Sequence, residues 1–467
     1  MDMKTKSWSL DGQAYLGDIF VDIPIELEYV ESLEIKEKMG CHATATIKAV
    51  LGKEESHGSI QKINKDTVVS IVAKNPEEKA IFCGIPKKIS IKHENKVHYL
   101  YLDLYSLSKK MDIEIKSRSF QDKEKLYENL YKEILKEYDG DVLDSVTESR
   151  ALEAPIIQYK ETDWEFLRRI ASHLEAPIYP HIKQPKIQMY LGINKADKYI
   201  SANFNYTIEK DIYTYKNYTS NFESWRELDQ TKYITQSKEE YQLGDKISHA
   251  DIVLTLGEKT TTLVDSVLTY TYTLQKESGL RQPKYYNEHI KGSSIKGKVL
   301  EVENDKVKLH LEIDEEQEVS TAHFYKFDTS YTTEGSTGWY IMPQVGDEAY
   351  LYQPIRNDSE SYVKRIERTD GKDNKKTKDP STKYLGTIHG NELKMSPTEL
   401  IFHEKESMYI KMTDTEGIEI RSPKDIEFTS SQIRFDAKEI SVEAKKNIQL
   451  ITEGANILMG EKMHLKG

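Results

Sequence analysis

The sequence has little cysteine, no long apolar run and no excess of positive charge. Cys41 and Cys83 are its only cysteines, too few for a disulfide framework and without metal-ligand spacing. No stretch approaches the roughly 18 uncharged apolar residues that a membrane-spanning helix requires. Lys and Arg number 66 against 78 Asp and Glu, a net charge of -12, which opposes binding to phosphate backbones. We therefore exclude a disulfide scaffold and membrane-spanning helices, and expect no nucleic-acid partner.

The start of the chain also lacks the features of an export signal. Residues 1–10 contain lysines but no apolar core after them, so we expect synthesis in the cytoplasm without a cleaved signal peptide.

Motifs of nucleotide, metal or nucleophile chemistry are incomplete. Residues 292–298 have the glycine and lysine spacing of a phosphate-binding loop, but Val299 replaces the Ser or Thr that would bind magnesium. His93 and His98 are five residues apart, whereas a zinc-protease helix needs four. We predict no cofactor, no metal and no catalytic residue, although the 78 acidic residues leave a paired-carboxylate site open.

Tyrosine is abundant instead, with 30 residues, and aromatic residues favour strands. A length of 467 residues predicts two to four domains. We expect a mainly β protein, in which residues 1–118 and 178–290 alternate as two β units around a helical insert at residues 119–177.

Two helices are predicted in the insert. Residues 123–138 repeat apolar side chains at Leu126, Leu130 and Ile134. A second helix is predicted to start at Thr162, which has capping-box spacing with Glu165. Its apolar residues, Trp164, Leu167, Ile170 and Leu174, are interpreted as core. For Arg168 and Arg169 a solvated face is the default, with contact to a neighbouring subunit as the alternative.

A compact barrel is expected next, at residues 291–366, with alternating strands at 294–302, 306–313 and 348–352. Residues 367–384 are almost free of apolar side chains and are predicted to be a solvated linker.

The tail, residues 385–467, carries a repeat. Apolar pairs start 8, 7, 7 and 8 residues apart, at Ile418/Ile420, Ile426/Phe428, Ile433/Phe435, Ile440/Val442 and Ile448/Leu450. Each unit of the repeat offers a strip only about two apolar side chains wide, and one chain cannot build a core from it. A hairpin meander and a single-chain solenoid are alternatives, but we expect three chains that share one core.

Three segments resemble a known family. Residues 158–174 (QYKETDWEFLRRIASHL) resemble the helix signature of VgrG proteins, the central spikes of contractile injection systems, and of related contractile-phage tail hub and late-control proteins. Residues 338–350 (GWYIMPQVGDEAY) and 287–302 resemble that family's OB-fold barrel and the entry into it. The resemblance implies a homotrimer with a hub of two β-barrels per chain, an OB-fold barrel and a C-terminal intertwined trimeric β-helix needle.

The resemblance also implies a function. A non-enzymatic spike of this kind caps the tube, initiates its assembly and pierces the target envelope when the sheath contracts. Its expected partners are the tail-tube protein, baseplate components and a separate tip or effector protein. The alternatives are a spike-borne cell-wall hydrolase or effector enzyme, for which the linker leaves little room, and a surface adhesin. The particle could be a phage, a bacteriocin, a secretion system or an extracellular injector.

The last residues, 457–467, suggest how the needle ends. His464 has no second histidine two residues away, so we expect a metal-free end. An exposed apolar patch requires a covering partner, which predicts that a tip protein docks on Leu458, Met459, Met463, His464 and Leu465.

Overall fold

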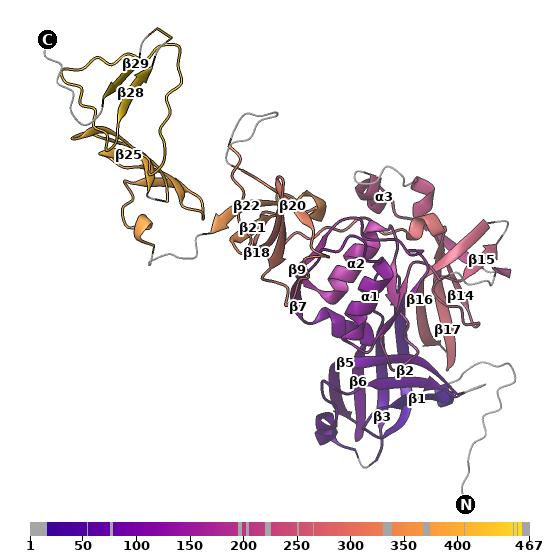
Figure 1. Cartoon of the computed structure of the whole chain (residues 1–467). Helices are drawn as coiled ribbons and strands as arrows, with labels where there is room; N and C mark the ends of the chain where they lie inside the picture. The colour runs from indigo at the N-terminus through magenta and orange to yellow at the C-terminus, as the bar shows by residue number, and fades with distance from the viewer. Residues whose placement is uncertain are drawn as a thin grey trace, which may run out of the picture. The chain divides into compact units, whose positions relative to one another are not determined.

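The computed structural model describes residues 16–459, except 54, 75–77, 195–198, 202–204, 220–225, 250–251, 265, 330–338, 368–373, 406, 452 and 455. The chain divides into two compact units, Met1–Thr369 and Asp370–Gly467, and is mainly β (Figure 1). No helix in the described ranges combines the length and apolarity needed to cross a lipid bilayer.

The first unit is built on one large sheet. Twelve strands take part, and its main path runs through β1 (Ile19–Asp22), β4 (Val69–Ala73), β5 (Lys79–Glu94), β6 (Val97–Ser106), β3 (Thr44–Leu51), β2 (Leu27–Lys38), β16 (Ile252–Val264), β17 (Val267–Gln275), β14 (Thr231–Ser237) and β13 (Tyr206–Lys210). Two further strands, β12 (Tyr199–Ser201) and β15 (Lys246–His249), extend from β16.

The two expected β units meet within this sheet, because β2 pairs with β16 from Lys38↔Glu258 to Glu34↔Thr262. Alternate residues of the strands fill one core, as in β3, where Ile47 and Ala49 are buried. One helix, α3 (Ile212–Thr219), lies where only strands were expected.

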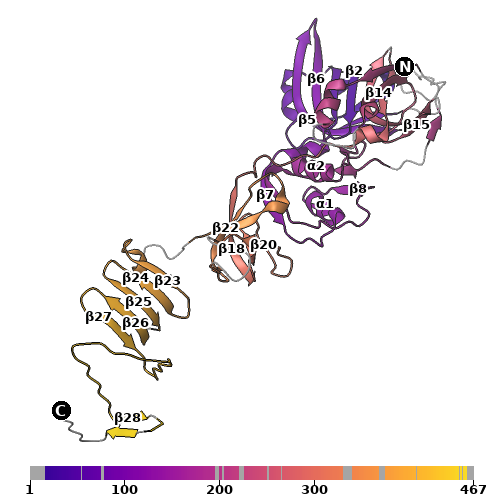
Figure 2. The ribbon, with the colours of Figure 1, turned by 90° about the horizontal axis from the view of Figure 1, so that it is seen from above.

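The insert contains both predicted helices. Figures 1 and 2 show α1 (Tyr127–Lys136) and α2 (Asp163–His173) between the large sheet and the barrel. The first helix begins later than predicted, because Leu126 is extended and bridges Ala151. The insert also holds the strands β8 (Asp141–Asp144) and β9 (Ile156–Thr162). Strand β7 (Ile115–Phe120) pairs with β9, and β11 (Gln188–Leu191) pairs with β8 and with β10 (Ile178–Pro180).

The capping box of α2 is confirmed. The Thr162 hydroxyl accepts a hydrogen bond from the Glu165 amide at 3.2 Å, and the Glu165 carboxylate accepts one from the Thr162 amide at 3.0 Å. Trp164, Leu167 and Ile170 are buried, as predicted, whereas Leu174, the fourth predicted core residue, is partly buried.

A closed barrel follows, with strand order β18-β19-β20-β22-β21. Its strands are β18 (Ser294–Glu303), β19 (Lys306–Leu311), β20 (Phe324–Phe327), β21 (Glu348–Tyr352) and β22 (Tyr362–Glu367). Strands β20 and β22 pair in parallel, and the other pairs are antiparallel. Lys296 and Gly297 lie inside β18, so the phosphate-loop spacing belongs to a strand.

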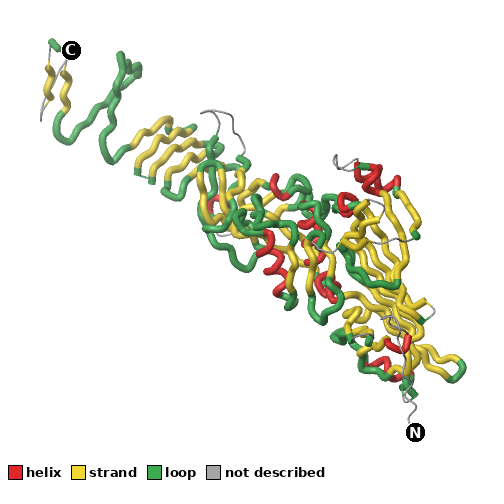
Figure 3. Tube along the Cα trace, turned by 90° about the vertical axis from the view of Figure 1, so that its right-hand side faces the viewer, coloured by secondary structure: helices red, strands yellow, loops and turns green. Residues whose placement is uncertain are grey.

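The second unit begins with an antiparallel meander, which Figure 3 shows as adjacent strands. Its strands are β23 (Lys383–Gly386), β24 (Asn391–Met395), β25 (Glu399–Glu404), β26 (Met408–Thr413) and β27 (Gly417–Arg421). Strand β23 starts inside the predicted linker. Residues 422–447 form no strand, and a hairpin of β28 (Ile448–Ile451) and β29 (Asn456–Met459) follows.

Candidate functional surfaces and the sheet–barrel joint

One face of the meander is apolar and uncovered. Cross-strand pairing places apolar residues in two adjacent rows: Leu385, Leu393, Phe402, Ile410 and Ile420, and next to them Met395, Leu400, Met412 and Ile418. Ile418 is 70% exposed, and none of the nine is buried. The two rows together are called the apolar face below.

The opposite face of the same sheet is polar. Its rows carry Tyr384, Lys394, Ile401, Lys411 and Glu419, and Glu392, His403, Tyr409 and Arg421. This alternation is the pattern of a sheet with one face in water and one face in a core. However, not one of the described residues of this unit is buried. The unit therefore has the residue pattern of a sheet that packs on a core, but its apolar face is not covered.

Sequence reasoning missed most of the apolar face, although its signal was present. Leu393/Met395, Leu400/Phe402 and Ile410/Met412 have the same pair spacing as Ile418/Ile420. The pair starts advance by 7, 10 and 8 residues from Leu393 to Ile418, so apolar pairs of this kind begin upstream of the first predicted pair.

The predicted needle pairs all lie on the second unit. Ile418 and Ile420 belong to β27, and Ile448 and Leu450 to β28. Between them, Ile426, Phe428, Ile433, Phe435, Ile440 and Val442 are exposed, Phe435 to 75%. Of the predicted tip residues, Leu458 and Met459 lie in β29. The other three, Met463, His464 and Leu465, lie outside the described residues.

The helix α2 forms the joint between the large sheet and the barrel, and one of its arginines corrects a prediction. Arg169 is only 2% exposed, not solvated. Its guanidinium binds the Glu161 carboxylate at 2.8 and 2.9 Å and the Ile157 carbonyl at 2.8 Å. Because Glu161 lies on β9, the pair fixes the helix to its neighbouring strand. Arg168 instead lies over the Tyr285 ring, 4.5 Å from its centre.

Asp163, the first residue of α2, is the centre of a polar cluster. Its buried carboxylate accepts hydrogen bonds from Lys116 (2.9 Å), Arg118 (2.5 Å), Tyr138 (2.7 Å) and Gln158 (2.9 Å). Burial opposes the charge, but these donors hold the pKa of Asp163 below its ordinary value. The cluster locks the start of α2 to β7 and to the end of α1.

The barrel is attached to the same strand, β7. The Ser119 amide and hydroxyl donate to the Asp314 carboxylate at 2.6 and 2.5 Å. The Gln121 side chain donates to the Leu309 carbonyl at 3.1 Å and accepts from the His323 amide at 3.2 Å. Ile157 of β9 is buried in the barrel core.

Residues 281–290 connect the large sheet to the barrel and lie along the end of α2; they are called the strap below. The Tyr285 amide donates to the Ser172 hydroxyl at 2.8 Å. The Tyr285 carbonyl accepts a hydrogen bond from His173 Nε2 at 3.0 Å. At the barrel end, Asn287 Nδ2 donates to the Tyr159 carbonyl at 2.8 Å.

A chain of Ser108, His42 and Asp112 beside α2 has the residue types of a hydrolase triad. His42 Nδ1 lies 2.7 Å from Ser108 Oγ, and its Nε2 lies 3.4 Å from Asp112 Oδ2. Burial lowers the pKa of His42 to about 4, and its ring packs on Trp164 with 3.9 Å between centres. Ser108 is 1% exposed and also bonds Ser106 at 2.8 Å. A buried hydroxyl cannot reach a substrate, so the chain fits a packing role.

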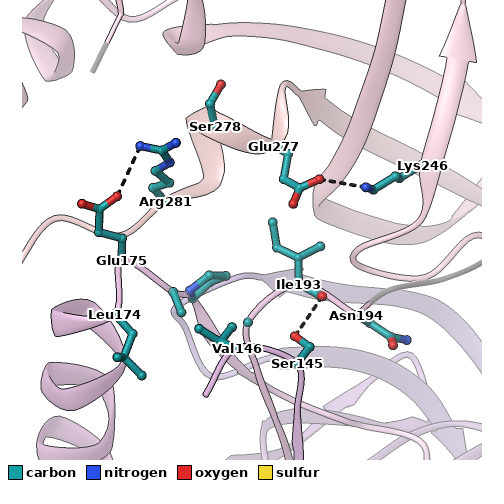
Figure 4. Close-up of a pocket in the computed structure, with 13 residues that line it drawn as sticks. Ser145, Val146, Leu174, Glu175, Ile193, Asn194, Lys246, Glu277, Ser278 and Arg281 are labelled. Atoms are coloured by element: carbon teal, nitrogen blue, oxygen red, sulfur yellow. Dashed lines mark hydrogen bonds and ion pairs between the residues drawn. The ribbon is translucent and has the colours of Figure 1, made fainter. Parts of the chain in front are cut away.

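A pocket of about 340 Å³ lies where the insert meets residues 277–281 (Figure 4). Two ion pairs border it, Glu175 with Arg281 at 3.3 Å and Lys246 with Glu277 at 2.9 Å. Its charged side chains are thus paired with each other across the junction.

A buried charge cluster joins both parts of the large sheet. The Glu240 carboxylate binds Lys183 at 2.7 Å, Lys79 at 2.9 Å and Lys259 at 3.3 Å. Lys259 is 3% exposed and also binds Glu37, its cross-strand partner, at 2.9 Å. Burial works against the Glu240 charge, but the lysines lower its pKa to about 2.

Two histidines that the sequence places near each other also meet in the structure. His93 and His98 face each other across the β5–β6 hairpin, with ring centres 4.4 Å apart. No group of three or more His, Cys, Asp or Glu could hold a metal ion among the residues that the structure describes.

Comparison with known proteins supports the fold. No protein-family model matches the sequence, and no curated protein matches it. The chain is similar to a chain of the solved Francisella PdpA-VgrG complex in its half-lidded form. The TM-score is 0.55 and the identity is 11%, over 86% of this chain and 87% of that one. The chain has a VgrG-like fold.

A second solved structure agrees with this result. The E. coli c3393 protein has a TM-score of 0.53 and 13% identity, over 74% of this chain and 98% of that one. It is described as a component of the type VI secretion system with structural similarity to the T4 bacteriophage tail proteins gp27 and gp5. The resemblance to VgrG proteins is thus confirmed as a likeness of fold.

Proposed function

We propose that the protein is a non-enzymatic, homotrimeric spike and hub at the tip of a contractile injection tube. In this role it caps the tube, initiates tube assembly, and pierces the target envelope when the sheath contracts. It is made in the bacterial cytoplasm and delivered outward as part of the particle.

The observation that carries the proposal is the missing core of the second unit. Nine apolar side chains share one uncovered face, and no described residue of the unit is buried. Full burial of a large apolar side chain contributes about 1.5–3 kcal/mol, so the face offers on the order of 10 kcal/mol per chain to a covering partner. Other copies of this chain are the partner that always accompanies it.

Three copies fit the residues that follow the meander better than two. Two sheets would form a sandwich whose core is as wide as several side chains. From Ile426 to Leu450, however, each unit of the repeat offers a strip only two apolar residues wide. Three such strips around one axis enclose a narrow core. The VgrG-like fold supports the same arrangement.

The first unit supplies the hub and collar in this proposal. Residues 1–118 and 178–290 would be two hub barrels joined through β2 and β16. Residues 291–366 would be an OB-fold, because a closed five-stranded barrel is the architecture of that fold. Residues 385–467 would then be the needle.

A separate tip or effector protein is the proposed cargo. The Francisella structure is itself a complex of VgrG with PdpA. In our chain the proposed docking residues are Leu458, Met459, Met463, His464 and Leu465. The remaining partners would be the tail-tube protein and baseplate components.

Native mass spectrometry of the full chain tests the assembly. We expect a trimer for the wild type and a monomer for Phe402→Asp with Ile410→Asp, because six charges would enter the shared core. Ile401→Asp is the matched control, because Ile401 lies on the polar face, where it pairs with Lys394 and Lys411. A monomeric wild type, or a trimeric double variant, would overturn the proposal.

A further inference from the structure

We propose that the strap is an acid-released latch over a pocket at the joint, and that His173 is the residue that senses pH. The inference concerns the first unit alone and is independent of the spike assignment. It stands on the pocket beneath the strap, on the contacts that hold the strap, and on the charges around His173.

The pocket has a volume of about 570 Å³. Strap residues 285–289 form one of its walls. Residues of α2, including Trp164 and Arg168, and the β-unit residues His42 and Lys109 form the others. Water in this pocket would lie directly against the strap. A detached strap would therefore be hydrated on its pocket side as well as on its outer side.

The contacts between the strap and α2 centre on Tyr285, and just beyond the helix the Glu175 carbonyl accepts a hydrogen bond from the Gln282 amide at 3.1 Å. Ser172 and His173 each bind one backbone group of Tyr285, and Arg168 lies over its ring. The His173 bond requires a proton on Nε2, since a carbonyl can only accept. Neutral His173 with its proton on Nε2 can therefore donate the hydrogen bond that the Tyr285 carbonyl accepts in the closed strap.

A second proton on His173 meets an unfavourable environment. Burial, together with the positive charges of Arg169 on α2 and Lys284 on the strap, lowers the pKa of His173 to about 4. The hydrogen bond to the Tyr285 carbonyl acts in the opposite direction and raises the pKa. Glu161 forms an ion pair with Arg169. The ring centres of Tyr286 and His173 lie 6.2 Å apart.

Opening the strap exposes His173 to water and moves Lys284 away, which restores an ordinary histidine with a pKa of 6.5. The closed form binds protons less readily than the open form. Acid therefore favours opening, and the open-to-closed ratio should rise about 30-fold between pH 8 and pH 5. The barrel stays attached, because Gln121 does not titrate and Ile157 and Ile290 are buried in the barrel core.

Hydrogen exchange of the full protein, followed by mass spectrometry of peptides covering residues 281–290, tests the latch. After correction for intrinsic exchange rates, protection of the strap should fall about 30-fold from pH 8 to pH 5. His173→Gln should keep its protection at pH 5, because the amide still donates to Tyr285 and does not titrate. His289→Gln, an exposed residue on the same strap, is the matched control and should keep the acid response.

Lys284→Gln provides a test that does not depend on the folding of the His173 variant. Lys284 is exposed, and its removal takes one positive charge away from His173, so the acid response should shrink. Equal wild-type protection at both pH values would overturn the proposal. So would a full acid response in His173→Gln, or an undiminished one in Lys284→Gln.

Discussion

The two units of the chain use the same alternation of residues and reach opposite states of burial. The first unit has three buried clusters, in the large sheet, the insert and the barrel. The second unit has an apolar face but no buried residue among those described. The difference shows that the pattern of a strand specifies which face is apolar, whereas the number of covering layers decides whether that face is buried. The first unit supplies its own layers, and in our proposal the second obtains them from other copies of the chain.

The largest expected effect is on the second unit. Ile433→Asp combined with Phe435→Asp should prevent the needle from assembling, because three copies of each charge would enter a core only two side chains wide. We expect loss of the trimer in native mass spectrometry and loss of any melting transition that depends on protein concentration.

The control for this prediction is a pair of lysine substitutions on the same stretch, Lys445→Asp and Lys446→Asp, at exposed polar positions. They should leave the trimer intact. A stable trimer with unchanged melting temperature in the double variant at 433 and 435 would contradict the shared core.

A smaller effect is expected in the first unit, which should respond as a self-contained fold. Lys259→Ala leaves Glu37 and the partly buried Glu240 without their common partner, and breaking a buried ion pair costs about 3–5 kcal/mol of unfolding free energy. Lys65→Ala, at an exposed lysine paired only with its neighbour at 3.8 Å, should change stability by less than about 0.5 kcal/mol. Denaturant unfolding measures both, and equal values would exclude a role for the cluster.

The same cluster predicts an acid dependence with a definite sign. The pKa of Glu240 is lowered from 4.5 to about 2 in the folded protein, so the unfolded chain binds the proton more readily. The stabilisation from Glu240 is therefore present above pH 4.5 and is lost as the pH falls toward 2. Glu240→Gln should be less stable at pH 7 and should lose less stability across that window.

Local signals predicted the elements of the first unit well. The capping box at Thr162 and Glu165 located the start of α2, and alternation located β21, because both signals depend on neighbours in the sequence. The helix α3 was missed because Tyr213, Tyr215 and Thr214 are residues that favour strands.

Long-range partners were beyond the sequence signals. Nothing near Arg169 in the sequence shows that Glu161 will reach it from β9 and allow its burial. The pairing of β2 with β16 joins residues more than 200 positions apart. The apolar face could have been predicted, because the pairs from Leu393 onward have the same two-residue spacing as Ile418/Ile420.

The smallest expected effect concerns the buried chain of Ser108, His42 and Asp112. If the first unit is a self-contained scaffold, these residues contribute packing and hydrogen bonds, and Ser108→Ala should lower the unfolding free energy by about 1 kcal/mol. Neither the wild type nor the variant should clear a suspension of cell-wall peptidoglycan. The decisive result is the comparison of the two pure proteins: clearing by the wild type that disappears in Ser108→Ala would make the chain catalytic. It would show that the first unit carries chemistry as well as structure, through a conformation in which the Ser108 hydroxyl becomes accessible.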